Sequence, residues 1–263
     1  MIIDTHAHLG SKSFDEDRDE AVAAALAAGV DRIITIGTSL TSSREAIELA
    51  DRHPSVFVAA GIHPTDVCDE RTDDWTTELE RLLDHPKVVA IGETGLDHFH
   101  PAPDGWTEDA YHRRQVEFFL EHLELAERLD FPVIVHQRES HEAILEVLEP
   151  FHGRVRCVFH CWNQSAALAL DLVEKDHRVS FTGIATFKSA ADVQACAAAL
   201  PAGTFFLETD SPYLSPVPHR GKKCQPAYVR FTGEHVAQLR EVSPETLFRE
   251  TTEAALAFFK RLS

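Results

Sequence analysis

The sequence predicts an α/β protein of the (β/α)8 TIM-barrel type, with eight parallel strands inside a ring of helices. Short apolar runs alternate with amphipathic helical segments along the chain, at about the spacing of strand–helix units. Apolar residues are consecutive within the runs, as expected for strands covered on both faces. The chain has 263 residues, and one such barrel needs about 250. Unit lengths vary and no signature repeats at a constant period, which disfavours a solenoid.

The predicted strands are short runs rich in β-branched and aromatic side chains. In chain order they cover residues 2–3, 32–36, 56–60, 88–92, 132–135, 157–159, 178–182 and 205–208. Consecutive parallel strands require a crossover connection, so the segments between them are expected to be helical.

Helices are predicted from hydrophobic periodicity and from signals at their ends. The first is acidic at its start and alanine-rich, and Gly29 stops it. Ser42 and Ser189 each precede an acidic residue by three positions, which predicts a cap at each. Ser243 precedes Pro244, the pattern of an N-cap followed by proline at the first helical position. The predicted helices cover 15–28, 42–51, 75–84, 107–129, 140–148, 166–175, 227–240 and 244–262, and another follows Ser189.

No linker or compositional break interrupts the chain, so a single domain over residues 1–263 is expected. The net charge of −18 argues against a broad basic face for nucleic acid; a phosphate-bearing substrate would be held locally, by metal ions and a few arginines. Apolar runs fall short of the ~18 residues of a membrane span, and no signal pattern opens the sequence. Five cysteines without framework spacing fit a reducing compartment. We expect a cytoplasmic protein, with no membrane or protein partner implied.

Two histidines at the end of the first strand begin the candidate metal site. His6 and His8 share a strand face, because successive side chains point to opposite faces. Two imidazoles are too few for a catalytic metal, which usually has at least three protein ligands. Four further candidates follow other apolar runs: Glu93, His136, His160 and Asp210. All would lie at the C-terminal ends of strands one, four, five, six and eight, where barrel active sites are built.

Four imidazoles and two carboxylates suit divalent ions such as zinc, manganese, nickel or magnesium. Six donors exceed one tetrahedral set, which predicts two ions. A carboxylate can bridge two ions and an imidazole cannot, so Glu93 or Asp210 is the expected bridge. A water on such an ion ionises near neutral pH, and Asp210 is placed to take its proton. Arg138 and Arg220, on loops beside the ligands, are candidates for holding a phosphate, with surface salt bridges as the alternative.

Several motifs carry a family resemblance. They are Asp4-Thr5-His6-Ala7-His8, Gly92-Glu93-Thr94-Gly95-Leu96-Asp97, Val135-His136-Gln137-Arg138, His160-Cys161, Glu208-Thr209-Asp210-Ser211-Pro212-Tyr213, Arg220-Gly221-Lys222 and Pro226-Ala227-Tyr228-Val229-Arg230. In this order they resemble the signatures of the TatD family of metal-dependent deoxyribonucleases, which are amidohydrolase-like barrels. The resemblance covers nearly the whole chain.

This resemblance implies a ligand set and an activity. One ion would be held by His6, His8, Glu93 and Asp210, and the second by Glu93, His136 and His160. Asp210 would also orient or deprotonate the attacking water. His63, in a Gly-x-His-Pro turn, would face the scissile phosphate or leaving group; the alternative is a capping histidine before Pro64. The implied reaction is metal-dependent phosphodiester hydrolysis, removing nucleotides from single-stranded or frayed 3′ ends of DNA.

Departures from the family pattern leave the substrate open. They are Trp162-Asn163-Gln164, Cys224-Gln225-Pro226 and His98, all on loops expected to line the cleft. One alternative is hydrolysis of a small ester, amide or lactone. The lactonase and phosphotriesterase relatives typically carry a carboxylated lysine at the fourth strand, whereas this chain has Glu93 there and Lys87 before the strand. The other alternative is a metal-holding scaffold without activity.

Other residues have ordinary structural readings. Trp162 and Phe187 could stack a base, and packing is an equal alternative. Cys157 and Cys161 lack a Cys-x-x-Cys spacing and are expected in the core. His98 and His100 are expected in a plain loop, with a lid or a metal contact as the alternative.

Overall fold

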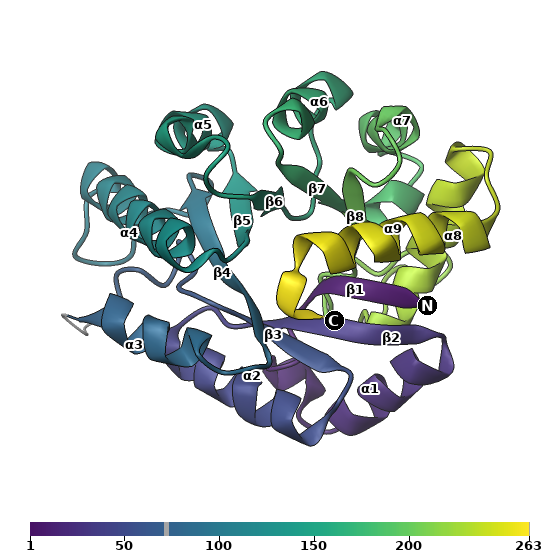
Figure 1. Cartoon of the computed structure of the whole chain (residues 1–263), viewed down its shortest axis with the longest axis horizontal. Helices are drawn as coiled ribbons and strands as arrows, with labels where there is room; N and C mark the ends of the chain where they lie inside the picture. Colours follow the sequence, from purple (N-terminus) through teal and green to yellow (C-terminus); the bar gives the residue numbers. More distant parts are fainter. Residues whose placement is uncertain (71–73, 263) are drawn as a thin grey trace.

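The computed structural model describes residues 1–70 and 74–262. Within these residues eight strands form one parallel sheet, and each strand pairs with its neighbours in sequence (Figure 1). The strands are β1 (Ile2–Ala7), β2 (Val30–Ile36), β3 (Val56–Ala60), β4 (Val88–Asp97), β5 (Val133–Arg138), β6 (Cys157–Phe159), β7 (Arg178–Phe181) and β8 (Phe205–Leu207). A bridge between Ala7 and Ser211 joins the two ends of the sheet. The predicted (β/α)8 barrel is confirmed.

Helices cover the outside of the sheet, as Figure 1 shows. They are α1 (Arg18–Ala27), α2 (Leu40–Arg52), α3 (Trp75–Leu83), α4 (Glu108–Leu129), α5 (His141–Leu148), α6 (Ala166–Glu174), α7 (Ala191–Ala199), α8 (Val229–Leu239) and α9 (Pro244–Phe258). None in the described part of the chain is long and apolar enough to cross a membrane.

Two predicted helix caps are wrong. The N-cap of α2 is Ser39, whose side chain accepts a hydrogen bond from the backbone N–H of Ser42, so Ser42 lies inside the helix. The earlier start places Leu40 in the core. Helix α7 begins after Ala190 without a side-chain cap, so the predicted cap at Ser189 is absent. The cap at Ser243, with proline next to it, is confirmed.

Four of the strands are longer than predicted. For β1, β4 and β5 this changes where the candidate ligands lie. His6, Glu93 and His136 lie within β1, β4 and β5 instead of following them. Strand β4 continues past Glu93 to Asp97 through a register shift between Ile91 and Thr94. Gly95 permits this continuation: its φ is +138°, and a β-carbon there would lie 2.1 Å from the carbonyl oxygen of His136.

The end of the chain closes the barrel on the side of the strand N-termini. The ring of Phe206 in β8 lies 5.2 Å from that of Phe258 and 5.6 Å from that of Phe259, between ring centroids. Arg261 donates a hydrogen bond to the carbonyl oxygen of Val88, the first residue of β4. Figure 1 shows α9 lying across the strands. The opposite end of the barrel, at the C-terminal ends of the strands, therefore remains open for a functional site.

Replacing Phe259 by alanine is expected to lower the free energy of unfolding by about 3–5 kcal/mol, since the side chain is fully buried in this cluster. Urea denaturation would measure the loss. Leu256→Ala, which truncates a partly buried side chain of the same cluster, is the control and should cost less. Equal losses would contradict a central place for Phe259 in closing the barrel.

Candidate metal centre

A cavity of about 870 Å³ opens at the C-terminal ends of the strands. The candidate ligands that line it are His8, Glu93, His136, His160 and Asp210, and His63 lies beside them. His6 lies behind His8 and is fully buried. The structure thus brings together all six predicted ligands at one end of the barrel.

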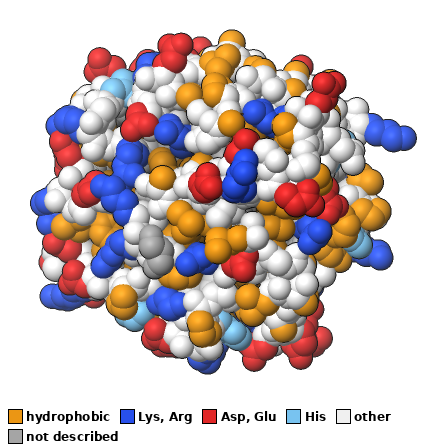
Figure 2. All heavy atoms as spheres, turned by 45° about the vertical axis from the view of Figure 1, so that its right-hand side comes forward, with side chains coloured by type: hydrophobic (Ala, Val, Ile, Leu, Met, Phe, Trp, Pro, Cys, Tyr) orange, Lys and Arg blue, Asp and Glu red, His pale blue; other side chains and the backbone are white. Residues whose placement is uncertain are grey.

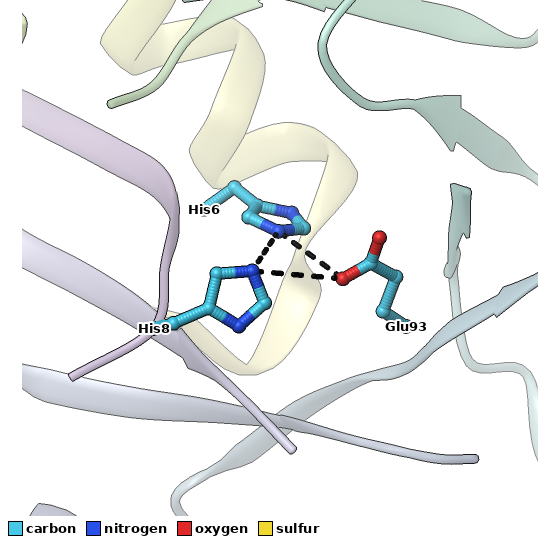
Figure 3. A group of neighbouring side chains, drawn as sticks. All are labelled: His6, His8 and Glu93. Carbon is cyan, nitrogen blue, oxygen red and sulfur yellow. Dashed lines mark hydrogen bonds and ion pairs between the residues drawn. The ribbon is translucent and has the colours of Figure 1, made fainter. Parts of the chain in front are cut away.

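The first group of donors joins β1 to Glu93 (Figure 3). The Nε2 atoms of His6 and His8 are 3.2 Å apart, and they lie 3.4 and 3.8 Å from Glu93 Oε2. Asp210 Oδ1 lies 3.3 Å from the same nitrogen of His8. Two donors bound at about 2.1 Å to one tetrahedral ion would be about 3.4 Å apart. The spacing of this group therefore suits a single divalent ion.

The second group surrounds the other oxygen of Glu93. Glu93 Oε1 lies 2.9 Å from His136 Nδ1 and 2.8 Å from His160 Nε2. These two nitrogens are 3.4 Å apart. His63 Nε2 lies 3.5 Å from the same oxygen, on the wall of the cavity. Each carboxylate oxygen of Glu93 thus faces its own set of imidazole nitrogens.

Barrel closure explains why ligands from distant parts of the sequence meet. The backbone N–H of Asp210 donates to the carbonyl oxygen of His6 at 2.9 Å, and that of His8 donates to Ser211 at 2.7 Å. Asp4 reinforces this junction, since its carboxyl oxygens accept from the backbone and side chain of Thr209 at 2.9 and 2.6 Å. The end of β1 and the segment after β8 are therefore held in one register.

The charge balance of the site fits a cation. Glu93 Oε2 is buried and has no hydrogen-bond partner among the described residues. An unsatisfied buried carboxylate oxygen is costly, and a divalent ion would satisfy it. The two donor groups, imidazole nitrogens with carboxylate oxygens, match the chemistry of such ions.

Neighbouring charges set the pKa values of these groups. Burial raises the pKa of Glu93, but the imidazoles of His160, His6 and His63 lower it more, so it lies well below the usual range. Burial lowers the pKa of His160, but Glu93 and Glu208 raise it more, so it lies well above the ordinary imidazole value. Hydrogen bonds to carboxylates likewise outweigh burial and raise the pKa values of His8 and His136. Glu93 is therefore ionised, and His8, His136 and His160 hold protons that a metal would displace. His6 differs, because burial and the charge of His160 lower its pKa.

The two predicted phosphate-binding arginines have different positions. Arg138 lines the cavity, and its guanidinium lies 3.6 Å above the centre of the Phe99 ring. Arg220 lies over Phe187 at the same distance, and it is not among the described residues that line the cavity. Neither forms a salt bridge within residues 1–70 and 74–262.

The structure decides between the two readings of Trp162 and corrects those of Cys161 and His100. Trp162 is buried with its ring edge-on to Phe159, so it packs instead of facing a base. Cys157 is in the core as expected, whereas Cys161 is partly exposed and lines the cavity. His100 also lines the cavity and is hydrogen-bonded to Asp97, so it is more than a plain loop residue.

Buried carboxylates behind the ligands were missed by sequence reasoning. Asp97 accepts a hydrogen bond from His136 Nε2 at 2.9 Å. Glu208 accepts from the backbone N–H of Cys161 at 2.7 Å and from the Ser180 hydroxyl at 2.5 Å, and lies 3.6 Å from His160 Nδ1. The available signal was an acidic residue inside an apolar run, which must find partners when it is buried.

Comparison with known proteins identifies the family to which the chain belongs. The chain matches the family described as TatD related DNase over residues 3–260. It is 34% identical to the metal-dependent hydrolase YabD of Bacillus subtilis over 99% of both chains, and 34% identical to the metal-dependent hydrolase TatD of Mycobacterium tuberculosis over 97% of this chain and 96% of that one. The solved structure of YjjV, a TatD homologue from Escherichia coli, superposes with a TM-score of 0.88 at 27% identity, covering 98% of each chain. The chain therefore belongs to the TatD related DNase family and is a metal-dependent hydrolase.

Proposed function

We propose that the chain hydrolyses phosphodiester bonds of DNA with two divalent ions and removes nucleotides from single-stranded or frayed 3′ ends. The observation that carries this proposal is the division of Glu93 between two groups of imidazoles at the base of an open cavity. Two ions held close together can act on both the attacking and the leaving oxygen of a phosphodiester. The family description, TatD related DNase, supports DNA as the substrate.

In this proposal Glu93 would help to hold both ions. The first would also be held by His6, His8 and Asp210, and the second by His136 and His160. When bound, the ions would acidify a water molecule and neutralise charge on the phosphoryl oxygens; magnesium, manganese, zinc and nickel are all candidates.

Asp210 is proposed as the group that orients the attacking water and takes its proton. It faces the cavity, and its pKa is lowered: burial raises it, but the hydrogen bond and charge of His8 lower it more. The carboxylate is therefore ionised and available as an acceptor. His63 is proposed to donate to the phosphate or leaving group, because Thr65 holds its Nδ1 atom at 2.6 Å and leaves Nε2 at the cavity wall.

Binding is proposed to be local. Arg138 would contact a phosphate from the cavity wall, and Arg220 a phosphate farther along the strand. Tyr213, with an exposed fraction of 58% and its ring 6.1 Å from that of His8, would offer a face for a terminal base. The face of the molecule in Figure 2 carries basic side chains interspersed with acidic and hydrophobic ones. With a net charge of −18, a long electrostatic track for duplex DNA is not expected.

Metal analysis at saturating manganese or zinc is expected to give two ions per chain, and the double variant His6→Ala, His8→Ala should retain one. The reason is the two separate donor groups that face the two oxygens of Glu93. His53→Ala is the matched control, because His53 pairs with Asp19 at 2.9 Å on the outer surface.

Chelation should abolish hydrolysis, and full activity after verified metal removal would exclude the mechanism.

The apparent affinity for zinc should rise with pH and continue to rise above the ordinary imidazole pKa of about 6.5. The pKa values of His8, His136 and His160 are raised, so their protons compete with the ion to a higher pH than free imidazole would allow. Competition with a chromophoric chelator at several pH values would measure this dependence. An affinity that does not change between about pH 6 and pH 8 would contradict the assignment of these ligands.

Asp210→Asn is expected to reduce kcat by about 10²–10⁴-fold, because the acceptor for the water proton is lost. Arg138→Ala should raise KM by about 10- to 150-fold, since a charged hydrogen bond contributes about 1.5–3 kcal/mol. It should also reduce the log–log salt slope by about one. The surface variant Arg128→Ala, which breaks a pair with Glu80, is the control.

The assay for both variants is digestion of DNA strands labelled at either end. Internal fragments without shortening from the 3′ end would overturn the exonuclease assignment. Absence of DNA cleavage beside fast turnover of a small ester, amide or lactone would favour the alternative hydrolase activity.

A further inference from the structure

Asp97, at the end of β4, is a fully buried carboxylate that lies directly behind the second donor group. Its Oδ1 atom accepts hydrogen bonds from the backbone N–H groups of Phe99 and His100, at 3.0 and 2.9 Å. Its Oδ2 atom lies 2.9 Å from both His136 Nε2 and His100 Nδ1. One oxygen thus holds the loop, and the other joins a candidate metal ligand to a histidine on the cavity wall.

The hydrogen bond to Asp97 determines which nitrogen of His136 can bind a metal. An ionised carboxylate only accepts hydrogen bonds, so Nε2 must carry the proton. In the neutral ring the lone pair is then on Nδ1, the atom that lies 2.9 Å from Glu93 Oε1. The ring is therefore oriented before an ion arrives, and loss of its Nδ1 proton leaves the tautomer that can bind one.

His136 differs in this respect from two other candidate ligands. Among the described residues, His6 Nδ1 and His160 Nδ1 are buried without a hydrogen-bond partner. The nearest carboxylate oxygen to the latter, on Glu208, is 3.6 Å away, which is too long for a hydrogen bond. Of these three histidines, His136 is therefore the one whose second ring nitrogen is hydrogen-bonded to a carboxylate.

We propose that Asp97 is the positioning residue of the second ion, fixing the tautomer and direction of His136, and that removing its Oδ2 acceptor weakens that ion selectively. This inference rests on the proposed two-ion centre. It does not depend on the identity of the substrate.

Asp97→Asn separates this role from the role in the loop. The side-chain oxygen of the amide can still accept from Phe99 and His100, so the loop keeps its anchor. The amide nitrogen replaces the acceptor beside His136 with a donor. His136 would then favour the tautomer with its proton on Nδ1, which cannot bind a metal through that atom.

The experiment is competitive titration of the metal-free full chain with zinc against a chromophoric chelator. The wild-type protein should bind two zinc ions per chain. In the Asp97→Asn variant the dissociation constant of one ion should rise about 10- to 100-fold, the usual effect of losing such a partner, while the other stays unchanged. Nitrogen-15 NMR of the metal-free proteins should show a proton on His136 Nε2 in the wild type, and a proton on Nδ1 with none on Nε2 in the variant.

Two further variants test whether the effect passes through His136. Gln115→Ala removes the side chain that bonds the backbone N–H and carbonyl of Asp97, at 2.9 and 3.1 Å. It should lower the thermal midpoint of the metal-free protein and leave both zinc affinities unchanged. His100→Gln removes the other partner of Oδ2 and should also leave them unchanged.

Unchanged zinc affinities in a folded Asp97→Asn variant would overturn the proposal, as would an equal loss in Gln115→Ala or His100→Gln. A wild-type protein that binds one zinc ion would instead contradict the two-ion centre on which the proposed function rests. The two failures are therefore distinguishable.

Discussion

The site depends on one buried carboxylate shared by two groups of imidazoles. Glu93 is 2% exposed, and its two oxygens face different histidines. In a medium of low dielectric constant such a group is stable only with compensating positive charge. The surrounding histidines provide some of it as protons, and divalent ions would provide it more completely. The residues around Glu93 hold those histidines in position.

Two structural features of the barrel hold the histidines in position. Hydrogen bonds between the end of β1 and the segment after β8 bring His6, His8 and Asp210 together from opposite ends of the sequence. The continuation of β4 beside β5 puts Asp97 next to His136 and carries the loop with Phe99 to Arg138. Any closed barrel has the first feature, contact between its first and last strands. The second, the continuation of β4, requires glycine at position 95, where β4 and β5 approach closely.

Sequence reasoning could predict the barrel and the group of six candidate ligands, because strand runs and acid–base residues at their ends are local patterns. Exact helix starts were harder, since Ser39 and Ser42 are equally suited to capping and burial of Leu40 decides between them. Asp4, Asp97 and Glu208 were missed because their partners, Thr209, His136 and Ser180, are known only after the strands are paired. Arg138 lines the cavity and Arg220 is not among the described residues that do. This difference depends on the course of the loops that carry them, which short sequence motifs do not predict.

The complete burial of His6 behind His8 has a consequence for the order in which the site is assembled. An ion between His6 and Glu93 has the cavity as its entrance, because β1 and its neighbours close the other sides. In the proposed function a nucleotide strand would occupy that same space. Metal would then have to load before substrate, and a bound substrate would slow the exchange of metal with solvent until product has left.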